Sequence, residues 1–225
     1  VMTHEIMNSI APISSLSETL LNEVQMKMND NHYEIDLGDI NDGISSIMKR
    51  SDVLMKFAKT YRTLNKVSQV HKSKITVDEL FKNIKDLMQP SLHQKHLMLQ
   101  FLNRDPKLEL NIDVHLIEQV LINLILNARD ACEDLPDSKV TISAEKLRES
   151  VLIKIIDNGK GISDEDFEHI FNKFYQSKNQ NTIKPQGSGL GLAICKQIIE
   201  QHNGKIWAKK GNKNGATFVF KLPFN

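Results

Sequence analysis

A repeating apolar seam between residues 34 and 66 constrains the fold of this chain more than any other feature. Alternating steps of three and four residues, a period of about 3.5, separate its members, which are Leu37, Ile40, Ile44, Ile47, Ser51, Leu54, Ala58 and Tyr61. Residues 3–27 carry a second helical stripe, formed by Ile6, Ile10, Ile13, Leu20 and Val24. A polar break at residues 29–32 separates the two. Residues 1–67 are therefore predicted to form a helical hairpin.

An isolated hairpin would leave this seam in contact with water. Pairing two hairpins into a four-helix bundle buries the seam. We therefore expect a homodimer that assembles through residues 1–67.

The rest of the chain has a different texture. Residues 68–74 are polar and typical of a linker, and residues 75–225 mix helical and β-branched segments. Helices are expected at 77–94, at 113–133 with Asp113 as the cap, at 163–171 with Ser163 as the cap, and at 190–202. Strands are expected at 97–102, 108–112, 140–147, 151–156, 205–210 and 217–222. The fold class is therefore α+β, in two parts.

Composition excludes several classes of protein. The net charge is +1, without the basic excess of a nucleic-acid binder. Cys132 and Cys195 lie in apolar helical stretches and are expected to be reduced core thiols. No apolar run approaches the ~18 residues of a membrane helix. Because the chain begins at Val1 inside an apparent helix, we expect a cytoplasmic fragment, anchored to a membrane only through a missing N-terminal part, if at all.

The helix at 113–133 carries Asn123 and Asn127 four residues apart, on one face. Asparagine is a poor mid-helix residue, so the pair needs a reason. One interpretation is that Asn127 offers a neutral oxygen to Mg²⁺ while Asn123 supports the site. A solvated polar stripe is the alternative.

Two glycine-containing segments follow. Asp157 ends a strand, and Gly159 and Gly161 follow it. The Asp157 carboxylate could accept a hydrogen bond from an exocyclic amine, and the two glycines would let the backbone approach a flat ring. An ordinary Asn-Gly turn is the alternative. Residues 187–191 open a helix and suit phosphate, or form an ordinary helix-start loop. A long polar segment precedes them, which excludes a dinucleotide-binding fold, and the ending of a P-loop is missing.

Near the N-terminus, His4, Glu5 and Asn8 form the fourth candidate. His4 points away from the apolar stripe, and Asn8 shares its face. Asn8 breaks the zinc-protease pattern HExxH. Taken alone, His4 is equally an ordinary exposed histidine.

In this order, the four segments resemble the sensor histidine kinases of two-component signalling, and the resemblance covers nearly the whole chain. It rests on the H box at 4–6, the N box at 118–128, the G1 box at 157–162, the F box at 170–178, the G2 box at 187–192, and the tail at 215–223.

The resemblance implies a two-layer α/β sandwich at 75–225 that holds ATP between the N-box helix and a lid at 172–186. Asp157 would read adenine, Asn127 would hold Mg²⁺, and Asn123 would line the phosphate side. The implied nucleotide contacts also include Gly159, Gly161, Ile162, Gly187, Ser188, Gly189, Leu190 and Gly191, with Lys178 near the phosphates and Thr217 beside the base.

The family's chemistry implies that a His4 ring nitrogen attacks the γ-phosphorus of ATP, with Glu5 orienting the ring or accepting its proton. The phosphoryl group would pass to an aspartate of a response regulator, and Asn8 matches a position that helps to dephosphorylate that regulator. Two departures stand out. Ser9 replaces a frequent proline, and Asp130 replaces a frequent Lys or Arg, so that Arg129 or Lys178 would have to substitute.

Two other classes of function compete with the kinase. One is a regulatory or scaffold protein that binds ATP or merely dimerises. The other is an ATPase whose closure drives conformational change, which the helical hairpin disfavours.

Overall fold

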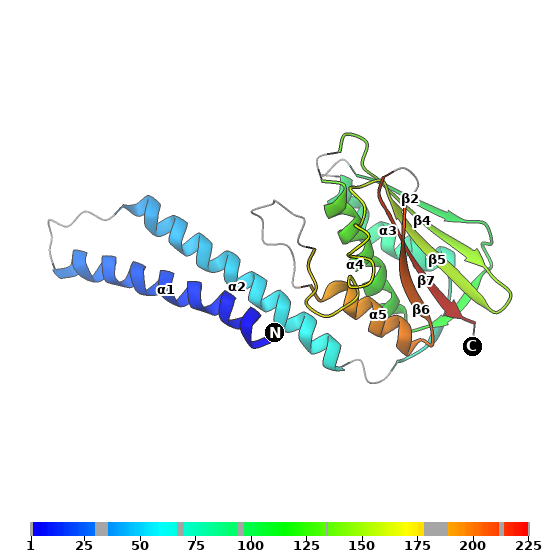
Figure 1. Cartoon of the computed structure of the whole chain (residues 1–225), viewed down its shortest axis with the longest axis horizontal. Helices are drawn as coiled ribbons and strands as arrows, with labels where there is room; N and C mark the ends of the chain where they lie inside the picture. Colours follow the sequence, from blue (N-terminus) through cyan, green and yellow to red (C-terminus); the bar gives the residue numbers. More distant parts are fainter. Residues whose placement is uncertain are drawn as a thin grey trace. The chain divides into compact units, whose positions relative to one another are not determined.

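The computed structural model describes residues 2–29, 36–66, 70–93, 97–133, 135–177, 189–211 and 214–224. The chain forms two compact units, Val1–Thr63 and Leu64–Asn225 (Figure 1). Within the described residues, no helix is long and apolar enough to cross a membrane.

The first unit is a helical hairpin, as the sequence predicted. Its helices are α1 (Met2–Asn29) and α2 (Leu37–Lys66). A Cβ on Gly43 would lie 3.0 Å from both methyl groups of Leu20, so the missing side chain lets α2 approach α1 closely. No described side chain of the two helices is buried, and Ile44 of the predicted seam is 48% exposed. The described part of the seam is therefore exposed or only half-buried in a single chain.

The second unit is a sheet covered by helices. Its five strands follow the order β2-β4-β5-β7-β6, and a separate pair joins β1 to β3. Only β2 and β4 run parallel in the large sheet. The strands are β1 (Ser73–Thr76), β2 (Met98–Asn103), β3 (Glu109–Ile112), β4 (Lys139–Lys146), β5 (Ser150–Asp157), β6 (Lys205–Lys210) and β7 (Ala216–Pro223).

Three helices lie on one side of this sheet (Figure 1): α3 (Val77–His93), α4 (Val114–Ala131) and α5 (Gly191–Gln201). Burial alternates along β5, where Val151, Ile153 and Ile155 are buried while Ile156 is exposed. Such alternation is expected for a sheet with one covered face. The predicted α+β class and two-layer sandwich are confirmed.

A reciprocal cap starts α3. Thr76 N donates to Glu79 Oε2 at 3.0 Å, and Glu79 N donates to Thr76 Oγ1 at 3.2 Å. This is a capping box, which satisfies backbone groups at the start of a helix. The hydrogen bonds from Thr76 hold the pKa of Glu79 below its usual value.

Two local predictions were wrong. Residues 163–171 form successive turns instead of a helix. The expected linker already contains Ser73 and Lys74 of β1. The two strands expected at 97–102 and 108–112 are present as β2 and β3, and each pairs with another strand: β2 with β4, and β3 with β1, across the turn at 103–107.

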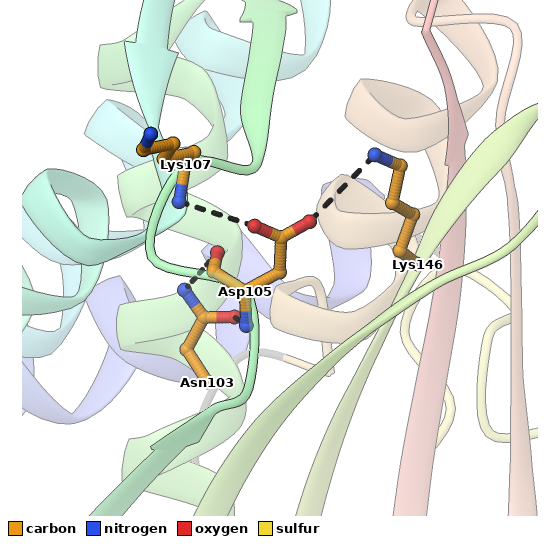
Figure 2. A network of polar contacts seen from close by, with 4 residues as sticks. All are labelled: Asn103, Asp105, Lys107 and Lys146. Atoms are coloured by element: carbon orange, nitrogen blue, oxygen red, sulfur yellow. Dashed lines mark hydrogen bonds and ion pairs between the residues drawn. The ribbon is translucent and has the colours of Figure 1, made fainter.

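That turn is held by a polar network around Asp105 (Figure 2). Asp105 accepts a hydrogen bond from Lys107 N at 3.2 Å and lies 3.6 Å from Lys146 Nζ. Asn103 donates to the Asp105 carbonyl at 3.0 Å and accepts from its N–H at 3.2 Å. The network fixes the direction in which the chain leaves β2, although an exposed ion pair of this kind contributes only about 0–1 kcal/mol.

The start of α4 and the end of α5 share a buried junction. Asp113 caps α4 as predicted, because its Oδ1 accepts from Leu116 N at 3.2 Å. Asp113 N donates to His202 Nε2 at 3.0 Å, and His202 Nδ1 lies 2.8 Å from the Ile198 carbonyl. These partners require a neutral imidazole with its hydrogen on Nδ1. Burial lowers the pKa of His202, and nearby Lys72 lowers it further.

This junction predicts a pH dependence of stability. Because the pKa of His202 is lowered in the folded state, the junction contributes fully above the ordinary histidine pKa of about 6.5. Its contribution is lost as the pH falls from there towards the lowered value. We expect His202→Gln to flatten the fall in the free energy of unfolding between pH 7.5 and 5.5, measured by urea denaturation. The control is His115→Gln, whose ring is 95% exposed on α4; equal slopes in the two variants would contradict the assignment.

Candidate functional site

A buried carboxylate at the end of β5 forms the centre of the site. Asp157 is only 4% exposed. Its Oδ1 accepts from Gly159 N at 2.9 Å and from Ala216 N at 3.1 Å. Its Oδ2 is buried and has no hydrogen-bond partner within the described part of the chain.

Burial raises the pKa of Asp157, and the two backbone N–H groups oppose that rise. A buried acceptor without a partner costs about 1–3 kcal/mol. The second oxygen is thus available to accept a hydrogen bond. A donor such as a nucleobase amine would satisfy it.

Three glycines bring backbone close to this carboxylate. A Cβ on Gly159 would lie 2.5 Å from the Ala131 carbonyl at the end of α4. A Cβ on Gly215 would lie 2.2 Å from the Asp157 carbonyl, and Gly161 in turn approaches Gly215. Gly161 and Gly215 also have positive φ angles of 78° and 101°, which side chains adopt at a cost. The half-buried Ile162 follows Gly161 directly.

Asn158 has a structural role that the sequence analysis missed. Its Oδ1 accepts from Lys139 N at 2.8 Å, and its Nδ2 donates to the Asp137 carbonyl at 2.7 Å. The side chain thereby fastens the loop after β5 to the beginning of β4. Residues 159 and 160 form a bend, and Asn158 holds this loop beside Asp157 in place.

The two asparagines of α4 are half-buried and differ in their surroundings. Asn123 faces α5, where its side chain hydrogen-bonds Cys195. Burial raises the pKa of the Cys195 thiol to about 12, which agrees with the predicted inert core thiol. Asn127 lies one turn closer to the glycine loop, and its side chain has no hydrogen bond within the described residues.

Arg129 and Asp130 pair with each other. Arg129 Nε and Nη2 donate to Asp130 Oδ1 at 2.8 and 2.7 Å. Both side chains are partly exposed. The positive charge next to the second asparagine is therefore already compensated within α4.

The start of α5 has free space beside it as far as the described residues go. Leu190 precedes the helix and gives no side-chain cap. A Cβ on Gly191 would meet no described atom within 4 Å. Backbone N–H groups at such a start attract anions. Gly189, with a φ of 65°, packs against Phe174 and accepts a hydrogen bond from Phe174 N at 2.9 Å.

The segment before the G2 box is anchored by Asp166, another residue that the sequence analysis missed. Asp166 accepts from Tyr175 Oη at 2.6 Å and from Ser177 Oγ at 2.7 Å. These bonds, with those from Ser163, hold the pKa of Asp166 below its usual value, and the contact with Asp166 raises the pKa of Tyr175. This side chain thus ties the turns at 163–171 to residues nine and eleven positions further along the chain.

The remaining predicted residues are placed less directly. Thr217 pairs in register with Ile156 and so projects to the sheet face opposite Asp157, although the Ala216 backbone beside it contacts that carboxylate. His4, Glu5 and Asn8 lie in α1, whose side chains there are not described. Three further predicted residues, Lys178, Gly187 and Ser188, lie outside the described residues.

The described residues include no group of three or more His, Cys, Asp or Glu side chains that would hold a metal ion. A Mg²⁺ ion at Asn127 would therefore need most of its ligands from nucleotide phosphates and water, which is common for magnesium.

Tight packing around Gly215 gives a stability prediction. Gly215→Ala should lower the free energy of unfolding by about 2 kcal/mol or more, because the residue adopts a positive φ and a Cβ would collide with the Asp157 backbone. The measurement is urea denaturation followed by circular dichroism. Gly191→Ala is the matched control and should change stability by less than about 1 kcal/mol. Equal stabilities of Gly215→Ala and the parent chain would refute this geometry.

The sequence of this chain is similar to those of known proteins. Residues 112–225 match the family of histidine kinase-, DNA gyrase B- and HSP90-like ATPases. The chain is 28% identical, over 225 residues, to the sensor protein KdpD of Clostridium acetobutylicum. This alignment covers 99% of this chain and 24% of that protein. The chain is 39% identical, over 111 residues, to the sensor protein SrrB of Staphylococcus aureus. This second alignment covers 49% of this chain and 19% of that protein. The chain thus spans a quarter or less of these relatives.

Solved structures give the same result. The catalytic domain of histidine kinase ThkA aligns with a TM-score of 0.60 and 30% identity, covering 68% of this chain and 98% of that domain. A structure of ThkA in complex with the response regulator protein TrrA aligns with a TM-score of 0.70 over the whole chain and 64% of that chain. Because the identity is only 24%, this second match shows likeness of fold alone.

Proposed function

The chain belongs to the family of histidine kinase-, DNA gyrase B- and HSP90-like ATPases, within its sensor histidine kinases, and from this premise we propose that it phosphorylates its own His4 with ATP. The observation that supports nucleotide binding is the buried Asp157 carboxylate, one oxygen of which has no hydrogen-bond partner among the described residues.

Adenine recognition rests on the way this carboxylate is held. The N–H groups of Gly159 and Ala216 both bind Oδ1, which fixes the direction of Oδ2. We infer that Oδ2 accepts a hydrogen bond from the exocyclic amine of adenine. The glycines at 159 and 161 keep side chains away from the plane of the ring.

The phosphates would lie at the start of α5. There, the backbone of Gly189, Leu190 and Gly191 would provide N–H groups. We propose the same role for Gly187 and Ser188, which lie outside the described residues. Asn127 would hold Mg²⁺ through its amide oxygen. When bound, Mg²⁺ supplies positive charge that neutralises the phosphate oxygens. Because Asp130 already engages Arg129, Lys178 is the better candidate for the missing basic contact.

Phosphoryl transfer follows from bringing ATP to the hairpin. A His4 ring nitrogen attacks the γ-phosphorus, an N–P bond forms, and the bond to the bridging oxygen breaks. ADP leaves with the electron pair of that bond, and the ring proton passes to Glu5, acting as general base. Positioning of the reactants provides most of the rate enhancement.

The downstream partner is proposed by analogy with ThkA, whose structure was solved with the response regulator protein TrrA. We infer that phosphohistidine passes its phosphoryl group to an aspartate of a response regulator. Asn8, one turn after His4, would help to dephosphorylate that regulator. Asn8→Ala should then slow phosphate release from an acetyl-phosphate-labelled regulator.

The domain organisation follows the same logic. Residues 1–67 would be the dimerisation and phosphoacceptor hairpin, and residues 75–225 the ATP-binding domain. Ile10 of the first helical stripe and Ile44 of the seam are exposed and support a homodimer, because a second hairpin would bury them.

Autophosphorylation with γ-labelled Mg-ATP tests the function. We expect acid-labile, base-stable label on the parent chain and none on His4→Gln, because the imidazole nitrogen is the nucleophile. The control is His115→Gln, which removes an exposed histidine from the ATP-binding domain and should label fully. ATP binding without label would indicate a regulatory protein, and free phosphate without label would indicate an ATPase.

A further inference from the structure

Three parts of the second unit meet at one buried residue. Asp113 is 9% exposed and begins α4. Its Oδ1 accepts from Leu116 N at 3.2 Å, and its Oδ2 accepts from His71 N at 2.9 Å. The backbone N–H of the same residue donates to His202 Nε2 at 3.0 Å. One aspartate thus contacts α4, the residue that follows α5, and the segment that precedes β1.

Two of these parts lead directly to the candidate site. From Asp113, α4 runs to Ala131, whose carbonyl accepts from Lys160 N at 3.0 Å in the glycine loop. In the opposite direction, α5 runs from Gly191 to the junction at His202. Each helix therefore has one end at the site and the other at the junction, about 27 Å away along α4. The two helices lie side by side (Figure 1), so the bond between Asp113 and His202 restricts their sliding.

The third part connects to the hairpin. His71 comes five residues after α2 ends at Lys66, a tether of no more than about 18 Å when fully extended. The ladder between β1 and β3 ends at the pair Ser73–Ile112. The bond from His71 N to the Asp113 side chain continues that ladder by using a side chain as the acceptor.

We propose that Asp113 is a positioning residue that fixes the tether of the phosphoacceptor hairpin onto the same two helices that hold ATP. The inference rests on the proposed function and adds a residue that touches neither nucleotide nor His4. Oδ1 and the backbone N–H serve the ATP-binding domain, whereas Oδ2 serves the tether. The two tasks are therefore separable by substitution.

Asp113→Asn separates them. Asparagine is as good an N-cap as aspartate, so its Oδ1 can keep the bond from Leu116 N, and the backbone bond to His202 does not involve the side chain. The new amide nitrogen then faces His71 N, and two donors cannot bond each other. The variant removes the tether contact and keeps the cap.

Asp105→Asn is the matched control. It makes the same chemical change in the network of Figure 2, where Asp105 holds the turn between β2 and β3 and contacts Lys107 and Lys146. That network reaches neither His71 nor His202. Any general effect of losing one carboxylate charge should appear in both variants.

The experiment measures three quantities on the full chain: the Kd for Mg-ATP, the autophosphorylation rate at saturating ATP, and hydrogen exchange of peptides covering residues 70–76. For Asp113→Asn we expect a Kd within about twofold of the parent, a rate lowered about tenfold or more by misplacement of the reactants, and faster exchange at 70–76. Asp105→Asn should match the parent in all three.

Two outcomes would overturn the inference: an unchanged rate, or a rise in Kd that accounts for the whole effect, which would show a merely structural cap. An absence of label on the parent chain is a different result, because it refutes the proposed function. In that case, hydrogen exchange alone tests the role of Asp113. Faster exchange confined to residues 70–76 in Asp113→Asn would support Asp113 as the anchor of the tether, and unchanged exchange would contradict it.

Discussion

The way the Asp157 carboxylate is held is the interaction on which the rest of the site depends. Two backbone N–H groups bind one oxygen, and the other is buried with no hydrogen-bond partner among the described residues. Folding alone gains nothing from such an oxygen, since burial raises the pKa of the group and an unmet acceptor is costly. A ligand with a hydrogen-bond donor would recover this cost, as the proposed function requires.

The surrounding structure is arranged to keep that carboxylate in place. Glycines at 159 and 215 allow the end of α4 and the β6–β7 turn to approach within distances that no side chain would permit, and Asn158 ties the loop to β4. At the opposite end of α4, Asp113 and His202 bind the two helices that flank the site. The proposed nucleotide site and the proposed anchor of the hairpin tether thus share the same pair of helices.

Much of this could be predicted from sequence, where the signal is local. The cap at Asp113 depends on residues three positions apart, and the alternation along β5 follows from the period of a strand. The missed features depend on distant partners. The four-residue strand β1 is mostly polar and exists because β3 pairs with it. The side chain of Asp166 reaches Tyr175 and Ser177, nine and eleven residues further along the chain. The face occupied by Thr217 follows from the register between β5 and β7, which no local pattern encodes.

The most direct test of adenine recognition by Asp157 compares the affinities of two nucleotides, ATP and purine riboside triphosphate, which lacks the exocyclic amine. Both affinities are measured by titration calorimetry, on the parent chain and on Asp157→Asn. We expect the parent to prefer ATP by on the order of tenfold or more, because the other nucleotide leaves the carboxylate oxygen unpaired. Asp157→Asn should lose this preference, because its amide donates where the carboxylate accepts. Equal affinities for the two nucleotides on the parent chain, or a preference that survives Asp157→Asn, would contradict adenine recognition by Asp157.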